Sequence, residues 1–293
     1  MTASAANGTV SLAAGITTGL VREAQARHTL APTASAAVGR LITGAALLGT
    51  SLVGRERLTL QINGDGPIGA VVADAWSGGD GVVTARAYAR QPRADLPLNA
   101  RGKFDVAGVI GTGQLQVTKS YEIGQPYNGI VPLETGEIGE DIASYLLNSQ
   151  QIPSVVALGV LANPSGIIAA GGVIAQLMPG ADESTIALLE ENARSMAPVT
   201  QQIADGADLQ ALLATVAGTL ELKVYRDYTL EFGCRCTREK VEIALLGLGR
   251  DELAKIASEQ PQTEATCDFC KRQFVLSAGD VAGLIARLDA SGR

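Results

Sequence analysis

All four cysteines of the chain lie near its carboxyl end, in two short stretches. "FGCRCTREK" contains Cys234 and Cys236, and "CDFCKRQF" contains Cys267 and Cys270. Tetrahedral zinc needs four ligands of this kind, and two short loops that each supply two thiols can provide them. The stretch that holds them is too short to bury much apolar core, so a metal would stabilise a unit that packing alone supports poorly. The sequence therefore predicts a small cysteine-bearing domain over residues 233–293.

The same thiols also suit other chemistry, and the residues alone leave it open. A purely structural zinc site needs only the four ligands, whereas two disulfides would fit a secreted protein. A thioredoxin-like redox enzyme also uses a Cys-x-x-Cys pair, although at the start of a helix that follows a strand. The Cys-x-Cys spacing adds a constraint, because its oxidation would close a small, strained ring that is easily reduced. Such a ring favours a reversible switch.

Positive side chains surround both cysteine pairs in the sequence. They would stabilise thiolates and a zinc tetrathiolate with its two net negative charges, or they would simply form a solvated surface. The residues concerned are Arg235, Arg238, Lys240, Lys271 and Arg272.

The first part of the chain mixes strand and helix patterns. Apolar residues alternate at Leu58, Leu60 and Ile62, and a Gly-Asp-Gly-Pro turn at residues 64–67 separates them from a second apolar run. Further strand-like runs cover residues 81–89, 105–111, 113–122, 154–162 and 166–178. Helical spacing is found at residues 20–28, 33–49 and 137–151. Runs of strands beside segregated helices predict an α+β domain over residues 1–180.

Helical patterns dominate the chain after Pro179 and Gly180. Residues 182–197 and 208–218 each place apolar side chains along one face, and such faces must be buried against another element. Apolar and polar residues then alternate over residues 219–232, just before Cys234. Residues 181–232 are therefore expected to form a linker segment between the α+β domain and the cysteine-bearing domain.

Charge and motifs argue against several classes of protein. The formal charge is −7, and because residues 234–293 are neutral, the whole of it falls on residues 1–233. Nucleic-acid binding normally requires a basic face, so no nucleic-acid partner is expected. The Gly-Lys at residues 102–103 lacks the other residues of a phosphate loop, so no ATP site is expected. His28, the single histidine, is expected to be a helix-surface or capping residue without a catalytic partner.

The amino terminus and the longest apolar run bear on location. The first residues show no basic start before their apolar run and no clean cleavage pattern, so we expect a cytoplasmic protein. The run over residues 34–53 is interrupted by Arg40 and by several glycines, so it is expected to be a buried helix rather than a membrane span.

Several stretches of the chain resemble one family. The cysteine motifs above look like the zinc-binding terminus of the heat-shock protein 33 family of redox-regulated bacterial chaperones. The stretches "LQINGDGPIG", "GIVPLETGEIGEDIASYLLNSQQIP" and "AAGGVIAQLMP" resemble the same family, in the same order. The similarity spans roughly residues 10–280 and is weakest in the first dozen residues and in the helical segment.

The resemblance implies a function. It implies an ATP-independent holdase chaperone, not an enzyme, that binds unfolding proteins under heat shock and oxidative stress. In its reduced form one zinc per chain would be bound by Cys234, Cys236, Cys267 and Cys270. Activation would follow oxidation of these redox-active thiols to the disulfides Cys234–Cys236 and Cys267–Cys270, with zinc release. The resemblance also implies that the activated protein forms a homodimer.

Metal linkage gives this switch a physical mechanism. Structural zinc in small domains is worth roughly 10–16 kcal/mol, more than the stability of an ordinary domain, so zinc loss should unfold the terminus. The helical stripes of the linker would then be free to move and expose apolar surface. Two other functions remain open: a constitutive zinc-ribbon interaction module and a thiol-disulfide oxidoreductase.

Overall fold

The computed structural model describes residues 1–291 and divides into two compact units, Met1–Gly233 and Cys234–Arg293. Strands and helices are both abundant in the first unit, and the helices are grouped rather than alternating strictly with the strands. The architecture is α+β, as the sequence predicts. Within the first unit, the proposed boundary at residue 180 and the linker over residues 181–232 stay predictions.

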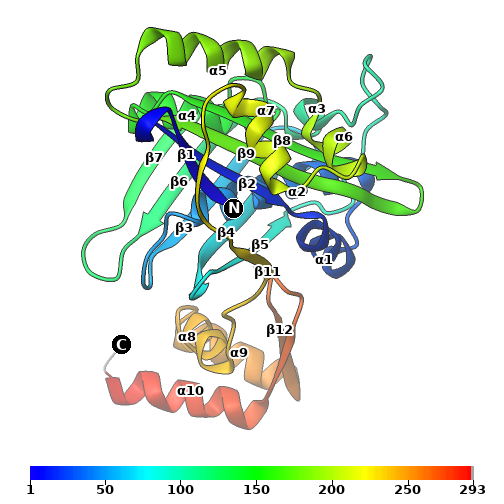
Figure 1. Ribbon diagram of the computed structural model, residues 1–293. Helices are drawn as coiled ribbons and strands as arrows, with labels where there is room; N and C mark the ends of the chain where they lie inside the picture. Colours follow the sequence, from blue (N-terminus) through cyan, green and yellow to red (C-terminus); the bar gives the residue numbers. More distant parts are fainter. Residues whose placement is uncertain (292–293) are drawn as a thin grey trace. The chain divides into compact units, whose positions relative to one another are not determined.

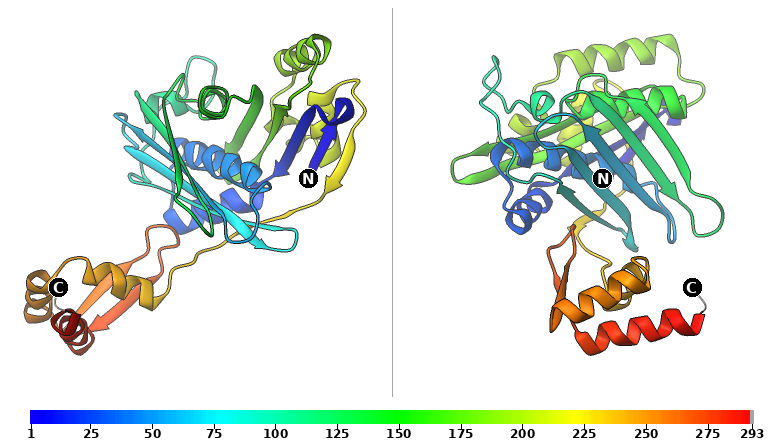
Figure 2. Two further views of the ribbon diagram at one scale, coloured as in Figure 1. Left: turned by 90° about the vertical axis from the view of Figure 1, so that its left-hand side faces the viewer. Right: turned by 180° about the vertical axis from the view of Figure 1, so that it is seen from behind.

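Two β-sheets, in which the strands do not follow the order of the sequence, form the frame of the first unit (Figures 1 and 2). The larger has six strands in the order β11 (Thr229–Phe232), β5 (Val82–Ala89), β4 (Ala70–Gly79), β3 (Arg57–Gly64), β6 (Gly113–Ser120) and β7 (Tyr127–Pro132). The smaller has five, in the order β10 (Lys223–Arg226), β1 (Thr2–Ala5), β2 (Val10–Ile16), β9 (Gly166–Leu177) and β8 (Ser154–Asn163). Every pair is antiparallel except β11 and β5, which are parallel. The strands β1 and β2, in residues 2–16, were not expected from the sequence.

The predicted hairpin over residues 58–72 is present as β3 and β4. The inward residues Leu58, Leu60 and Ile62 are buried, as their alternation indicates. Between the strands, the Asp65 carboxylate accepts a hydrogen bond from the Thr112 amide at 2.7 Å. The Gly-Asp-Gly-Pro stretch is therefore a turn held by a neighbouring loop, in agreement with turn chemistry.

The main apolar core lies between the two sheets and is centred on helix α2 (Pro32–Gly49), which packs against strands of both (Figure 2). A Cβ added at Gly39 would lie 2.6 Å from Val160, and one added at Gly44 would lie 2.6 Å from Ile142. These glycines therefore let the helix approach its neighbours closely, which explains why they interrupt the apolar run. The run is a buried helix, as predicted, and among the described residues no helix is both long and apolar enough to span a membrane.

Three further helices border this core: α1 (Thr18–His28), α3 (Val106–Ile110) and α4 (Gly139–Gln150). The strand predicted over residues 105–111 is wrong, because this stretch forms α3. The Asp105 carboxylate accepts a hydrogen bond from the Gly108 amide at 2.9 Å, and Gly111 adopts a positive φ of 75° where the helix ends. An aspartate cap and a glycine stop thus make a short helix of an apolar run that resembles a strand.

A second apolar cluster lies on the opposite face of the smaller sheet. It is covered by α5 (Glu183–Ser195), α6 (Val199–Ala204) and α7 (Leu209–Ala217). The predicted apolar stripes supply the contact, since Leu189, Leu212, Leu213 and Val216 are all buried. The helical segment therefore packs on the sheet of its own unit.

The second unit is small. It contains α8 (Arg238–Leu246), α9 (Arg250–Glu259), a hairpin of β12 (Gln262–Thr266) and β13 (Gln273–Ser277), and α10 (Ala278–Ser291). Its core is one cluster of five buried side chains: Leu253, Leu276, Val281, Leu284 and Leu288.

Candidate metal centre

The first cysteine pair lies in the loop that precedes α8. The Lys240 ammonium donates a hydrogen bond to the Arg235 carbonyl at 2.6 Å, directly between the two cysteines. Thr237 caps α8 by accepting a hydrogen bond from the Lys240 amide at 3.3 Å. The start of the helix therefore anchors the loop that carries Cys234 and Cys236.

The second pair lies in the turn of the β12–β13 hairpin. The Cys267 amide donates to the Arg272 carbonyl at 2.9 Å, and the Lys271 amide donates back to the Cys267 carbonyl at 2.9 Å. Lys271 has a φ of 59°, the left-handed conformation that lets the chain reverse direction tightly. This turn presents Cys267 and Cys270 on one side.

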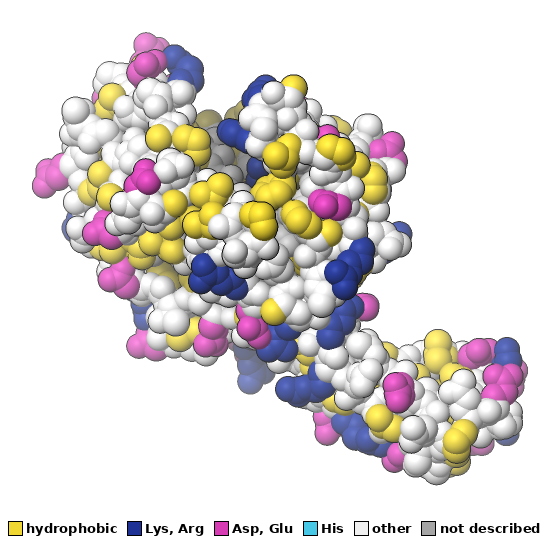
Figure 3. Space-filling view, turned by 90° about the vertical axis from the view of Figure 1, so that its right-hand side faces the viewer, with side chains coloured by type: hydrophobic (Ala, Val, Ile, Leu, Met, Phe, Trp, Pro, Cys, Tyr) yellow, Lys and Arg dark blue, Asp and Glu magenta, His cyan; other side chains and the backbone are white. Residues whose placement is uncertain are grey.

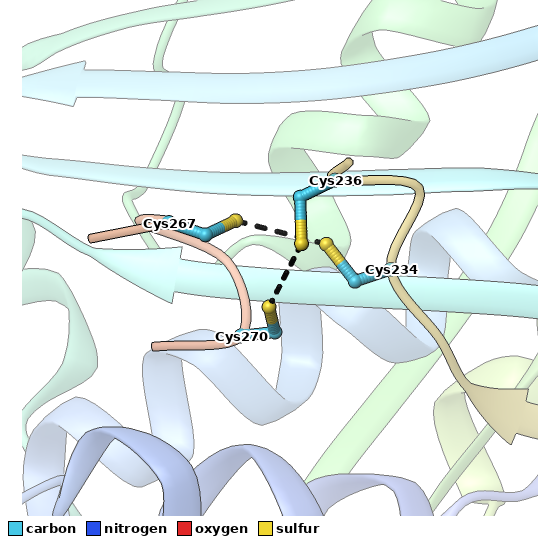
Figure 4. Close-up of side chains that lie close together, drawn as sticks. All are labelled: Cys234, Cys236, Cys267 and Cys270. Carbon is cyan, nitrogen blue, oxygen red and sulfur yellow. Dashed lines mark hydrogen bonds between the residues drawn. The ribbon is translucent and has the colours of Figure 1, made fainter. Parts of the chain in front are cut away.

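The four sulfur atoms converge on one point (Figure 4). They all lie within 4.8 Å of one another, with Cys234 Sγ 3.7 Å from Cys267 Sγ and Cys236 Sγ 3.4 Å from Cys270 Sγ. No disulfide joins any two of them. Four sulfurs bound to one zinc at about 2.3 Å would lie about 3.8 Å apart in a tetrahedron. The residues predicted from sequence are thus brought together, and their arrangement fits one tetrahedral metal ion.

The environment of two of the thiols, Cys236 and Cys267, opposes their ionisation when no cation is near. Burial raises the pKa of the Cys236 thiol, and its hydrogen bonds with Cys270 and Cys234 raise it further. Burial also raises the pKa of Cys267, although hydrogen bonds from the Cys270 and Phe269 amides work in the other direction. A bound dication would supply the charge that stabilises four crowded thiolates.

Arg238, one of the positive residues noted near the cysteines, has a structural role. Its guanidinium pairs with Glu242 at 3.3 Å and with Asp280 at 2.9 Å, and it donates to the Val275 carbonyl at 3.0 Å. It therefore ties α8 to α10 and β13, and the two carboxylates offset its charge. Asp280 was not identified from the sequence, and no local pattern connects it with Arg238. The hairpin around the second pair was also missed, although Phe274, Val275 and Leu276 are residue types that strands favour.

His28 lies at the end of α1 and is buried, with 3% of its surface exposed. Of the two expected roles, that of a helix-surface residue is therefore wrong, and that of a capping residue at the helix end stays a prediction. It belongs to the first unit, whereas all four cysteines belong to the second.

Fold and site together define the class of the protein. It is an α+β protein with a small second unit whose four cysteines can hold one metal ion. A family model described as Hsp33 protein matches residues 1–277. The 33 kDa chaperonin of Bacillus licheniformis is 41% identical over 280 residues, which are 95% of each chain. The 33 kDa chaperonin of Bacillus subtilis is 40% identical over 280 residues, covering 95% of this chain and 94% of that one.

A solved structure agrees with these sequences. The crystal structure of the 33 kDa chaperonin, or heat shock protein 33 homolog, of Thermotoga maritima covers 98% of both chains with a TM-score of 0.88 and 33% identity. The chain belongs to the Hsp33 family, and the resemblance noted in its sequence is confirmed. It is an Hsp33-type chaperone.

Proposed function

We propose that the protein is a redox-regulated holdase that needs no ATP, and that Cys234, Cys236, Cys267 and Cys270 hold one zinc in its reduced form. The observation that carries the proposal is the convergence of four cysteine sulfurs within 4.8 Å of one another. Thiolate ligands in a tetrahedral set favour zinc over hard cations such as magnesium or calcium. Oxidation would remove the ligands and release the metal, with Cys234 pairing with Cys236 and Cys267 with Cys270.

Zinc release would have a large structural effect on the second unit. Its core has five buried apolar side chains, a small number on which to fold alone. Structural zinc contributes about 10–16 kcal/mol of binding free energy to a small domain, so its loss exceeds what such a core can replace. The zinc-free, oxidised unit is therefore expected to unfold.

The first unit offers the apolar surface that a holdase needs. Figure 3 shows apolar side chains gathered on one face of the first unit, with few charges among them. More apolar surface lies under α6 and α7, which cover inner residues of the smaller sheet such as Leu12 and Val173. Residues 181–232 would act as the switch segment, since moving these helices away exposes that surface to unfolding proteins.

The remaining features of the proposal follow from the family and the thiols. The partners would be unfolded or partly unfolded proteins, and the activated chain would form a homodimer. A site that uses four thiol ligands needs a reducing compartment, which supports a cytoplasmic location. The role is that of a binding protein rather than an enzyme.

The test is light scattering of a thermally unfolding client protein without ATP. The oxidised chain, prepared with peroxide at elevated temperature, is expected to suppress the scattering, and the reduced zinc-loaded chain is not. Equal suppression by both forms would instead support a constitutive zinc-ribbon interaction module. Turnover of a disulfide substrate without any suppression would support a thiol-disulfide oxidoreductase.

A further inference from the structure

Residues 228–232 lie along the edge of the larger sheet as an added strand. Within them β11 pairs in parallel with β5, from Thr229 beside Val82 to Phe232 beside Ala85. The Thr229 amide donates to the Gly81 carbonyl at 2.8 Å, and the Gly233 amide donates to the Ala85 carbonyl at 3.1 Å. Among the described residues β11 is an edge strand of this sheet, and because amide direction alternates along a strand, the amides of Leu230 and Phe232 point away from β5.

The side chains of this segment alternate between the protein and the solvent. Tyr228, Leu230 and Phe232 are half-buried and pack against the main apolar cluster, whereas Thr229 and Glu231 are exposed. The segment therefore has the pattern aromatic-x-aliphatic-x-aromatic in an extended conformation.

The surface that receives these side chains lies between the edge of β5 and helix α1, and we call it the groove. A Cβ added at Gly15 would lie 3.0 Å from Leu230 Cδ1, so the glycine leaves room for this leucine. The Arg27 guanidinium of α1 lies 5.0 Å from the centre of the Phe232 ring, within the range of a cation–π contact. On the β5 side, the Thr84 hydroxyl donates to the Glu231 carboxylate at 3.2 Å.

Residues 228–232 are held in place by few interactions. They contain a four-residue strand in parallel pairing, the slightly weaker of the two kinds, and their apolar side chains are only half-buried. They are also joined through Gly233 alone to Cys234, the first of the four thiols. If the segment left, β5 would become an unpaired edge beside an apolar groove, and an unpaired edge is a template for strand addition.

We propose that this groove, bounded by β5, α1 and Gly15, is a recognition site for extended client segments. Its ligand is a peptide strand with apolar or aromatic side chains at three alternate positions, as an unfolding protein exposes from its sheets. Residues 228–232 occupy the groove in the resting chain as an internal competitor. The inference rests on the proposed function, in which activation frees the segment that precedes the cysteines.

The experiment measures fluorescence anisotropy of labelled peptides with the full-length chain. The probe is the chain's own sequence RDYTLEFG, residues 226–233. We expect the oxidised chain to bind it, and the reduced chain to bind it about tenfold more weakly or not at all, because the groove is then filled. The composition control RDTEYLFG, which keeps only two of the three apolar side chains at alternate positions, should bind more weakly.

Two N-methylated probes test the strand pairing itself. Methylation of the threonine nitrogen removes the donor that corresponds to the Thr229 bond with Gly81, and should weaken binding about tenfold. Methylation of the leucine nitrogen, which corresponds to an amide directed away from β5, should leave binding unchanged. Equal binding of the two methylated probes would overturn the proposal, because it would show apolar affinity without pairing.

The same samples separate this inference from the proposed function. Light scattering is recorded on each, and an oxidised chain that suppresses aggregation but binds no probe overturns the groove alone. If oxidation produces no suppression, the proposed function fails, and the reduced Thr229→Pro chain decides the inference. This variant loses the bond to Gly81, so probe binding by it supports the groove, and no binding by a variant with wild-type circular dichroism overturns it.

Discussion

Leu213 in α7 offers a direct test of the helical segment as the switch. It is fully buried, as are its neighbours Leu212 and Val216, and together they attach α7 to the smaller sheet. Burial of such side chains contributes about 1.5–3 kcal/mol each, so these three contribute about 5–9 kcal/mol to docking. Replacing Leu213 by glutamate forfeits about 2–5 kcal/mol, and keeping an unpaired carboxylate buried costs several kcal/mol more.

The two costs together match what these three side chains contribute, so the Leu213→Glu segment should undock rather than bury its charge. The reduced, zinc-loaded variant is therefore expected to suppress client aggregation without oxidation. Ala214→Glu is the matched control, because it places the same charge on the exposed face of the same helix. It should behave as wild type.

Suppression of aggregation is measured by light scattering of a thermally unfolding client. Wild type and both variants are compared in the reduced form, and the zinc content of each is determined. The reasoning is refuted if Leu213→Glu keeps its zinc and its fold and stays as inactive as wild type until it is oxidised. Activation would then have to reside in the second unit alone.

Three further perturbations have defined outcomes. Asp141→Ala should lower the free energy of unfolding by about 2–5 kcal/mol in denaturant titrations, because the buried Asp141 carboxylate accepts hydrogen bonds from four backbone amides. The control Glu140→Ala, at an exposed position, should change the free energy of unfolding by less than about 0.5 kcal/mol. Cys270→Ser should reduce helical circular dichroism as much as chelation reduces it in wild type, and a zinc-loaded variant with full signal would contradict the site. Chains ending at residue 180 or 233 should both unfold cooperatively, and chelators should not change their stability. The shorter chain should bind more of a dye that reports apolar surface, because it lacks the helices that cover the smaller sheet. An insoluble shorter chain would show that the boundary at residue 180 is misplaced.

The elements predicted correctly from the sequence are those in which apolar residues recur at the regular spacing of a strand or a helix. The alternation at Leu58, Leu60 and Ile62 and the apolar stripe containing Leu212 and Leu213 each describe one buried face, and the structure buries both. The period carries this information because side-chain direction follows directly from strand or helix geometry.

The errors arose where a local cap or a distant partner decides the outcome. Residues 105–111 are apolar enough for a strand, yet the Asp105 cap makes them begin a helix. Residues 2–16 are rich in small side chains, so their strands depend on pairing with β9 and β10 rather than on an apolar pattern. His28 ends α1, a helix that packs against β5, β9 and β11 as well as α2, and no local pattern reveals these distant contacts.

The four cysteines could be singled out from the sequence because their chemistry is carried by one residue type in two short motifs, and their role as metal ligands stays a prediction. Four cysteines could be named from spacing alone, and their sulfurs do converge. The ion pair that supports the site could not be predicted, because Arg238 and its partner Asp280 lie far apart in the sequence of the second unit. Long-range ion pairs leave no signal in a single sequence.

The central claim is that zinc, thiols and chaperone activity change together. One reduced preparation is titrated with peroxide at elevated temperature, and zinc release, remaining thiols and suppression of client aggregation are measured on each sample. The account predicts one zinc and four thiols per chain at the start, then parallel loss of both as suppression rises. A carefully reduced sample with almost no zinc, or full suppression while zinc and all four thiols remain, would contradict it.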